Sequence, residues 1–167
     1  MSIFSVENDR TGNSTYTLAE KLLYVKKAYA TSYDLMYGAN VSITNPFEEM
    51  MMVKENAGQE QRKGYFHYVL SPEEADDCSA EQMYVVGWQV AELIGRFEGD
   101  YQVLMAVHRD TPHIHAHFIA NNIDYMTGQR MNLNRTRLML LKQRINKILQ
   151  QEGISLIRAF SYENNRI

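Results

Sequence analysis

Two apolar segments in the second half of the chain constrain its fold more than any other feature. Residues 101–107 (YQVLMAV) lead into His108, and residues 113–121 (HIHAHFIAN) follow after a short connection. Strands joined by so few residues must pair antiparallel, because a parallel pair needs a long crossover. We therefore expect an antiparallel hairpin here. A barrel of alternating strands and helices, which needs far more chain, is excluded.

The rest of the sequence predicts further short strands and several amphipathic helices. Apolar residues favour strands over residues 2–6 and 64–70, and a short strand or an extended connection over 40–44. Helices are favoured over about 17–29, 45–58, 79–99 and 134–153. This order predicts an α+β fold, a mainly antiparallel central sheet flanked by helices. The chain has no internal repeat and no linker rich in proline or glycine, so we expect a single domain, residues 1–167.

The composition excludes several classes of protein. Cys78 is the only cysteine, which rules out an intrachain disulfide and a thiolate-rich zinc site. No apolar run approaches twenty residues and the N-terminus lacks a signal pattern, so we expect a cytoplasmic protein without membrane insertion. The net charge of −3 hides a basic C-terminal third. Between Gly128 and Arg158 its positive residues are Arg130, Arg135, Arg137, Lys142, Arg144, Lys147 and Arg158.

Four of the five histidines lie within ten positions, from His108 to His117. Side chains alternate along a strand, so His113, His115 and His117 are predicted to share one face. Imidazoles at positions i and i+2 are well placed to bind one cation, and His108 could add a third ligand across the hairpin. Asp110 is close enough in sequence to orient a ligand or to act as a base.

A cluster of this density favours metal binding over simple packing. A lone histidine is usually a core residue, and we interpret His67, on the strand at 64–70, in that way. Three nitrogen ligands suit Mn²⁺, Zn²⁺, Ni²⁺ or Co²⁺, whereas Mg²⁺ prefers oxygen. An incomplete ligand set leaves room for substrate oxygens, which indicates Lewis-acid chemistry on a phosphate or a carbonyl group.

The segment from His108 to Asn121 fits the pattern H-x-D-x-x-H-x-H-x-H-x-x-x-N without a gap. It resembles the third motif of plasmid and conjugative-element relaxases, the MobP-like mobilisation nucleases of the HUH endonuclease superfamily. Residues 18–31 (LAEKLLYVKKAYAT) are similar to the first motif of that family, a helix that carries a nucleophilic tyrosine. The resemblance covers about residues 1–155.

The resemblance implies a set of site residues. Tyr24 corresponds to the nucleophile, and Tyr29 is the next candidate; Asp110 and His113 are candidates for assisting its deprotonation. The implied metal ligands are His108, His115 and His117. The candidates for DNA contacts are Lys26, Lys27, Arg135 and Arg137.

The resemblance also implies an activity. It predicts metal-dependent, site- and strand-specific nicking and strand transfer at an origin of transfer, through a covalent 5′-phosphotyrosyl intermediate, which starts the conjugative mobilisation of a plasmid or integrative element. The expected partners are single-stranded origin DNA and accessory relaxosome proteins. The expected cofactor is a divalent ion, Mn²⁺ or Mg²⁺ first and Zn²⁺, Ni²⁺ or Co²⁺ as alternatives. Related enzymes carry further C-terminal regions, so the chain is either an isolated nuclease domain or the N-terminal part of a longer protein.

Three other functions are compatible with parts of this pattern. An HUH replication initiator would use the same local chemistry. A metal-dependent hydrolase of small phosphates or amides is disfavoured by the short chain and by the lack of later ligand clusters. A metal-stabilised DNA-binding module without catalysis would not need Tyr24. A net acidic chain is also unusual for a DNA-binding domain, so either the basic third, a missing region or an accessory protein supplies the affinity.

Overall fold

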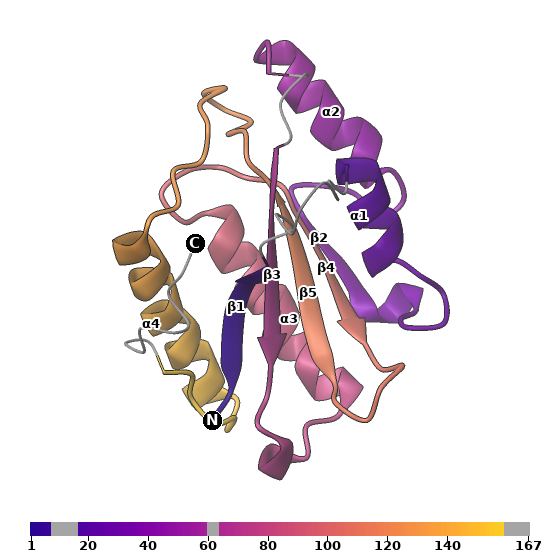
Figure 1. The fold of residues 1–167 in the computed structure, drawn as a ribbon, viewed down its shortest axis with the longest axis vertical. Coiled ribbons are helices and arrows are strands. Elements are labelled where there is room, and N and C mark those ends of the chain that lie inside the picture. The colour runs from indigo at the N-terminus through magenta and orange to yellow at the C-terminus, as the bar shows by residue number, and fades with distance from the viewer. Residues whose placement is uncertain (8–16, 60–63, 159–167) are drawn as a thin grey trace.

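The computed structural model describes residues 1–7, 17–59 and 64–158, and within them a single five-stranded sheet (Figure 1). The strands are β1 (Ile3–Glu7), β2 (Met36–Ala39), β3 (Tyr65–Ser71), β4 (Val103–His108) and β5 (His115–Asn121). Their spatial order is β1-β3-β5-β4-β2, and every neighbouring pair is antiparallel. The predicted α+β class and the predicted hairpin are therefore confirmed.

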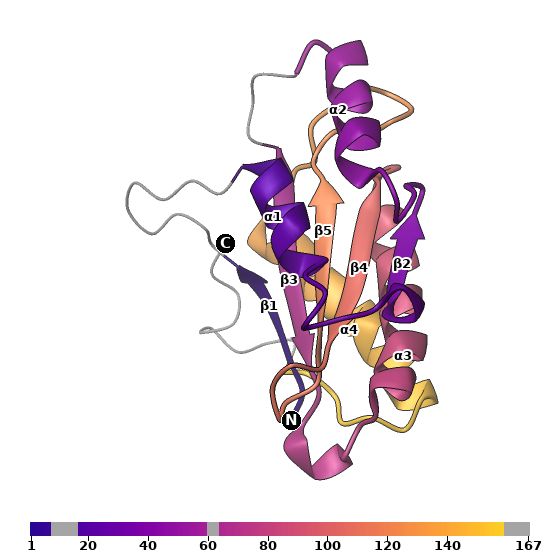
Figure 2. The ribbon, with the colours of Figure 1, turned by 90° about the vertical axis from the view of Figure 1, so that its right-hand side faces the viewer.

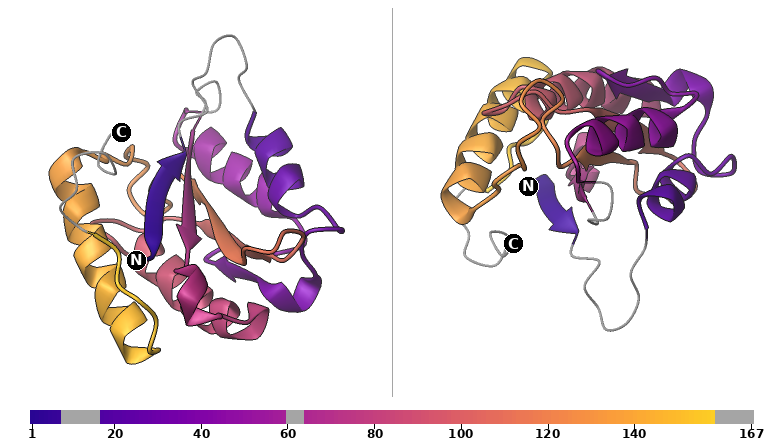
Figure 3. Two further views of the ribbon diagram at one scale, coloured as in Figure 1. Left: turned by 60° about the horizontal axis from the view of Figure 1, so that its bottom comes forward. Right: turned by 90° about the horizontal axis from the view of Figure 1, so that it is seen from above.

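Helices cover both faces of this sheet, as Figure 2 and the left panel of Figure 3 show. Leucines of α1 (Leu18–Val25) and Met50 of α2 (Pro46–Asn56) pack on one face, and α3 (Ala80–Gly95) and α4 (Arg135–Gln151) pack on the other. Two short 3-10 helices, Tyr33–Leu35 and Glu74–Asp76, complete the described elements. No described helix is long and apolar enough to cross a membrane.

The central strand β5 is buried between these two layers. Ala116, Phe118 and Ala120 face the large core beneath α3 and α4, whereas Ile119 belongs to the smaller core beneath α1 and α2. Since side chains alternate, His117 shares the face of Ile119. The sheet therefore presents the histidines of β5 to the layer that contains α1.

Two predicted elements differ from the structure. Of the two alternatives at 40–44, the strand does not form: β2 ends at Ala39, and Asn40 takes a left-handed conformation (φ 58°). The chain folds back so closely there that a β-carbon at Gly38 would collide with the Val41 carbonyl. The helix expected to reach residue 29 ends at Val25 and is followed by a turn. Its beginning agrees with the prediction, because Thr17 forms a capping box with Glu20. The other helices and strands lie within a few residues of their predicted bounds.

Lys54 connects α2 by hydrogen bonds to the residue before β3 and the residue after β5. Its side chain is 1% exposed, and its ammonium group donates hydrogen bonds to the carbonyl of Gly64 at 2.6 Å and to Oδ1 of Asn122 at 2.9 Å. A β-carbon at position 64 would collide with Nζ of Lys54 and with Oδ1 of Asn122, which explains the glycine there. Burial, aided by the positive charge of Arg130, lowers the pKa of Lys54 to about 8.

The buried Lys54 predicts an unusual dependence of stability on pH. Between pH 8 and its ordinary pKa, the unfolded state binds more protons at this position than the folded state, so the free energy of unfolding should rise with pH across that window. The rise should approach ~3 kcal/mol, since one pKa unit corresponds to about 1.4 kcal/mol. Urea denaturation of the wild type and Lys54→Met from pH 7.5 to 10 measures it. The variant should lack this rise, and parallel curves for the two proteins would contradict the prediction.

Candidate active site

Three histidines converge at the β4–β5 hairpin. His108 is the last residue of β4 and lies directly opposite His115, the first residue of β5, while His117 follows two positions later. One ring nitrogen from each lies within 4.8 Å of the others, and no other such group of three was found in the described ranges. We call these residues the three-histidine cluster. It brings together the three ligands that the resemblance implies.

Hydrogen bonds to the main chain fix two of the three rings. Nε2 of His108 lies 2.8 Å from the carbonyl oxygen of Val25, and Nδ1 of His115 lies 2.8 Å from the carbonyl oxygen of His113. A carbonyl only accepts, so each of these nitrogens carries the proton. Nδ1 of His108 and Nε2 of His115 therefore keep lone pairs, the arrangement that prepares an imidazole to bind a metal.

His117 provides the test of whether a cation fits. Its side chain is 5% exposed, Nδ1 is 2.8 Å from Nε2 of His67, and Nε2 is buried without a hydrogen-bond partner. Burial, reinforced by the neighbouring imidazoles and Lys27, lowers the pKa of His117 far below its usual range. The ring is thus neutral, as metal binding requires, and one of its nitrogens lies within 4.8 Å of a nitrogen of each of the other two rings. The donor set fits a divalent cation.

Tyr24 lies over this cluster from the last turn of α1. Its ring centroid is 5.9 Å from that of His117, edge to face, and 6.1 Å from that of His108. The buried side of α1 includes Leu18, Leu22 and Val25, and Tyr24 lies outside it and is 42% exposed. The structure therefore places an accessible tyrosine beside a buried group of imidazoles.

Lys27 and Asp110 border the tyrosine. Nζ of Lys27 is 4.3 Å from the ring centroid of Tyr24 and 3.6 Å from a carboxylate oxygen of Asp110. Burial lowers the pKa of Lys27, but a hydrogen bond with Tyr29 and the negative charges around it raise that pKa by more, so the net shift is upward. A stable positive charge thus lies next to the tyrosine ring.

Three other predicted residues do not join the cluster through their side chains. The prediction that His113 shares a strand face with His115 and His117 is wrong, because β5 begins only at His115 and His113 lies in the exposed bend before it. Lys26 donates its ammonium hydrogen bond to the carbonyl of Ile43, which ties down the loop before α2. Tyr29 lies beyond the end of α1 and is 75% exposed, with Lys27 above its ring.

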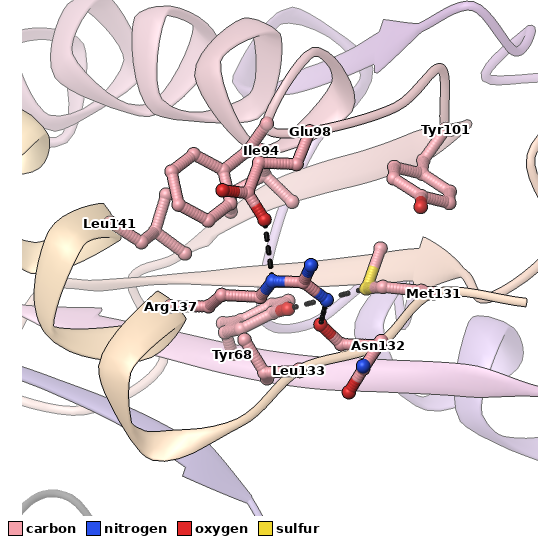
Figure 4. Close-up of a pocket in the computed structure, with 10 residues that line it drawn as sticks. Tyr68, Ile94, Glu98, Tyr101, Met131, Asn132, Leu133, Arg137 and Leu141 are labelled. Atoms are coloured by element: carbon pink, nitrogen blue, oxygen red, sulfur yellow. Dashed lines mark hydrogen bonds and ion pairs between the residues drawn. The ribbon is translucent and has the colours of Figure 1, made fainter.

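Arg135 and Arg137 begin α4, on the opposite face of the sheet from the cluster. Nε of Arg137 is 2.6 Å from a carboxylate oxygen of Glu98, and Nη1 donates to the carbonyl of Asn132 at 2.7 Å. Figure 4 shows this guanidinium group closing a small cavity that Tyr68 also lines. The cavity measures about 20 Å³, room for about one water molecule. The contacts of Arg137 are therefore with the fold itself, and neither arginine lies at the candidate site.

His67 is the residue that sequence reasoning missed. We interpreted it as a core residue, and it is indeed 4% exposed, yet its ring stacks on that of His117 with centroids 5.0 Å apart. The contact depends on the pairing of β3 with β5, two strands that are far apart in sequence. No local pattern around residue 67 carries that information.

The comparisons with known proteins agree with this geometry. The family model described as "Relaxase: MobA/VirD2-like, nuclease domain" matches residues 16–154. The chain belongs to this family. The relaxase domain is also similar to three Staphylococcus aureus proteins named Protein rlx, with 30%, 28% and 26% identity over 90 residues. Each match covers 54% of this chain, but only 26%, 28% and 27% of the respective relatives, so the matched part is about a quarter of their length. The resemblance carried by residues 108–121 is confirmed.

The three-histidine cluster predicts stabilisation by a divalent cation. Metal at a hundredfold excess over its dissociation constant should raise the free energy of unfolding by about 2.7 kcal/mol. Thermal unfolding with and without Mn²⁺ or Co²⁺ measures the effect. His115→Ala should abolish it, whereas the matched control His113→Ala, which keeps the carbonyl that holds His115, should retain it. Equal loss in both variants, or no metal effect on the wild type, would refute the site.

Proposed function

We propose that this relaxase domain nicks one strand of DNA at an origin of transfer and stays attached to that strand through a 5′-phosphotyrosyl bond to Tyr24. The observation that carries the proposal is the exposed Tyr24 ring, 5.9 and 6.1 Å from two rings of the three-histidine cluster. An accessible nucleophile beside a candidate metal site is the arrangement that phosphoryl transfer needs. Membership of the relaxase family supports the same assignment.

Attack by a tyrosine suits a reaction that must later be reversed. The oxygen of Tyr24 forms a bond to the scissile phosphorus, the bond from phosphorus to the 3′ oxygen breaks, and that oxygen leaves as a 3′-hydroxyl. One phosphodiester replaces another, so a later 3′-hydroxyl can attack the phosphotyrosine and rejoin the strand. Attack by water would lose that possibility, because it leaves a free 5′-phosphate.

The chain's own groups have distinct parts in this step. Nδ1 of His108 and Nε2 of His115 and His117 would hold a divalent cation, which when bound polarises the scissile phosphate oxygens as a Lewis acid. Their nitrogen chemistry is compatible with Mn²⁺, Zn²⁺, Ni²⁺ or Co²⁺, while Mg²⁺ prefers oxygen ligands.

Lys27 and Asp110 assist the nucleophile in this proposal. A phenol in water loses its proton only near pH 10, so a positive charge beside the ring favours attack by stabilising the negative oxygen. Lys27 supplies that charge, and the carboxylate of Asp110 holds Lys27 in place. Asp110 therefore acts through Lys27, whereas the role of His113 lies in its carbonyl, which orients His115.

The biological setting is the mobilisation of a plasmid or integrative element. Single-stranded origin DNA is the proposed substrate. The net charge of −3 makes the chain a weak general DNA binder by itself. Accessory relaxosome proteins, or further regions such as those that make the matched relatives longer, would supply the remaining affinity.

A covalent adduct tests the nucleophile. The domain is incubated with Mn²⁺ and an oligonucleotide that carries the origin, labelled at either end, and then resolved under denaturing conditions. The 3′-label should move with the protein and the 5′-label should appear on a free shorter strand. Tyr24→Phe should abolish the adduct, and the control Tyr29→Phe should keep it. An adduct that survives Tyr24→Phe, or nicking without any adduct, would contradict the proposal.

The two adjacent lysines predict different effects on DNA binding. Lys27 faces the tyrosine, whereas the ammonium group of Lys26 is engaged by Ile43. If Lys27 contacts a phosphate, Lys27→Ala should lower the slope of log affinity against log salt by ~0.7 for a single strand, and Lys26→Ala should leave it unchanged. Fluorescence anisotropy with a single-stranded origin oligonucleotide gives both slopes. An unchanged slope in Lys27→Ala would remove Lys27 from the DNA-binding surface.

A further inference from the structure

We propose that His67 is a positioning residue that holds His117 in the tautomer needed for metal binding, a role that rests on the proposed three-histidine metal site. His67 is on β3, and its ring contacts that of His117. His67, outside the three-histidine cluster, thus determines which nitrogen of His117 carries the proton.

Sheet pairing brings the two rings together. Val69 of β3 lies opposite His117 of β5, and His67 lies opposite Ile119, so His67 and His117 are diagonal neighbours on one face of the sheet. Their rings are nearly parallel, at 26°, and Nε2 of His67 is 2.8 Å from Nδ1 of His117. Both side chains are buried, 4% and 5% exposed, so this contact is shielded from water.

The proposed metal site requires one of the two possible directions of this hydrogen bond. Between two ring nitrogens at hydrogen-bond distance, one must donate and the other must accept. If His67 were the donor, neutral His117 would carry its own proton on Nε2 and could not bind a cation through that nitrogen. If His117 donates from Nδ1, its Nε2 instead keeps a lone pair, in a ring that has one nitrogen within 4.8 Å of those of His108 and His115. The second arrangement is the one in which His67 accepts.

His117 differs from the other two ligands in how its ring is held. His108 and His115 donate to carbonyl oxygens of the main chain, which remain in place whatever side chain stands there. The corresponding partner of His117 is a side chain. The tautomer of His117 is thus the one that a substitution at another side chain can change. Substitution of a residue that hydrogen-bonds to a metal ligand typically lowers metal affinity 10- to 100-fold.

A purely structural role for His67 is the competing explanation, since it also fills space in the sheet. Glutamine and methionine separate the two roles, because they are similar in length and shape but only glutamine offers a strong hydrogen-bond acceptor. We expect His67→Met to weaken Co²⁺ binding about 10- to 100-fold and His67→Gln to recover most of that loss. Isothermal titration of the metal-free domain with Co²⁺, together with the visible absorption of bound Co²⁺, measures affinity without DNA or catalysis. Tyr29→Phe, at an exposed position outside the cluster, is the control that should bind Co²⁺ as the wild type does.

The outcomes separate the failure of this role from the failure of the proposed function. Wild-type affinity in His67→Met, or equal loss in both variants, would overturn the role of His67 and leave the metal site standing. No Co²⁺ binding by the wild type would overturn the site itself. Long-range ¹H–¹⁵N NMR of the metal-free wild type provides a check that needs no variant to fold: His117 should carry its proton on Nδ1, and a proton on Nε2 would refute the proposal.

Discussion

The hydrogen bond from Nε2 of His108 to the carbonyl of Val25 connects the two halves of the candidate site. The last carbonyls of a helix have no partner within it, and a side chain from the neighbouring sheet meets that need here. The same bond orients His108 and sets the distance between the sheet and the end of α1, where Tyr24 precedes Val25. A second contact reinforces it, because the amide of Arg109 donates to the carbonyl of Ala30 at 2.8 Å. These contacts therefore fix both the position of Tyr24 and the orientation of His108.

The sheet explains why the histidines have the spacing that they do. On β5 the imidazoles alternate with small and apolar residues, so Ala116 and Phe118 pack into the core beneath α3 and α4 while His115 and His117 face α1. The third histidine lies on β4, opposite His115, because a strand can place only every second side chain on one face. Strands packed on both sides are rigid, and a rigid base suits a site whose ligands must be held closely in place.

Much of the fold and of the candidate site was predictable from sequence. The errors about the end of α1, His113 and His67 share one cause. The hairpin, its three converging histidines and most helices follow from local patterns. The end of α1 was misplaced because tertiary contacts at Val25 and Ala30, and not the composition of residues 26–29, end the helix. His113 was placed on a strand because alternation continues back from His115, although pairing with β4 stops at the pair His108–His115. His67 was missed for the same reason, since only the lateral order of the strands brings β3 beside β5.

The burial pattern of the site separates the buried imidazoles from the exposed tyrosine. His67, His108 and His117 are each at most 5% exposed. Burial lowers the pKa of His108 and of His117, so those two rings stay neutral. Neutral rings do not repel a cation, but they must be oriented, because each offers one lone pair only. Tyr24 has the opposite requirement. In the proposed reaction, Tyr24 would attack a phosphate that arrives from solvent and would carry the strand afterwards, which is incompatible with burial. A short helix, held to the sheet by its leucines and by the carbonyl of Val25, meets both requirements at once.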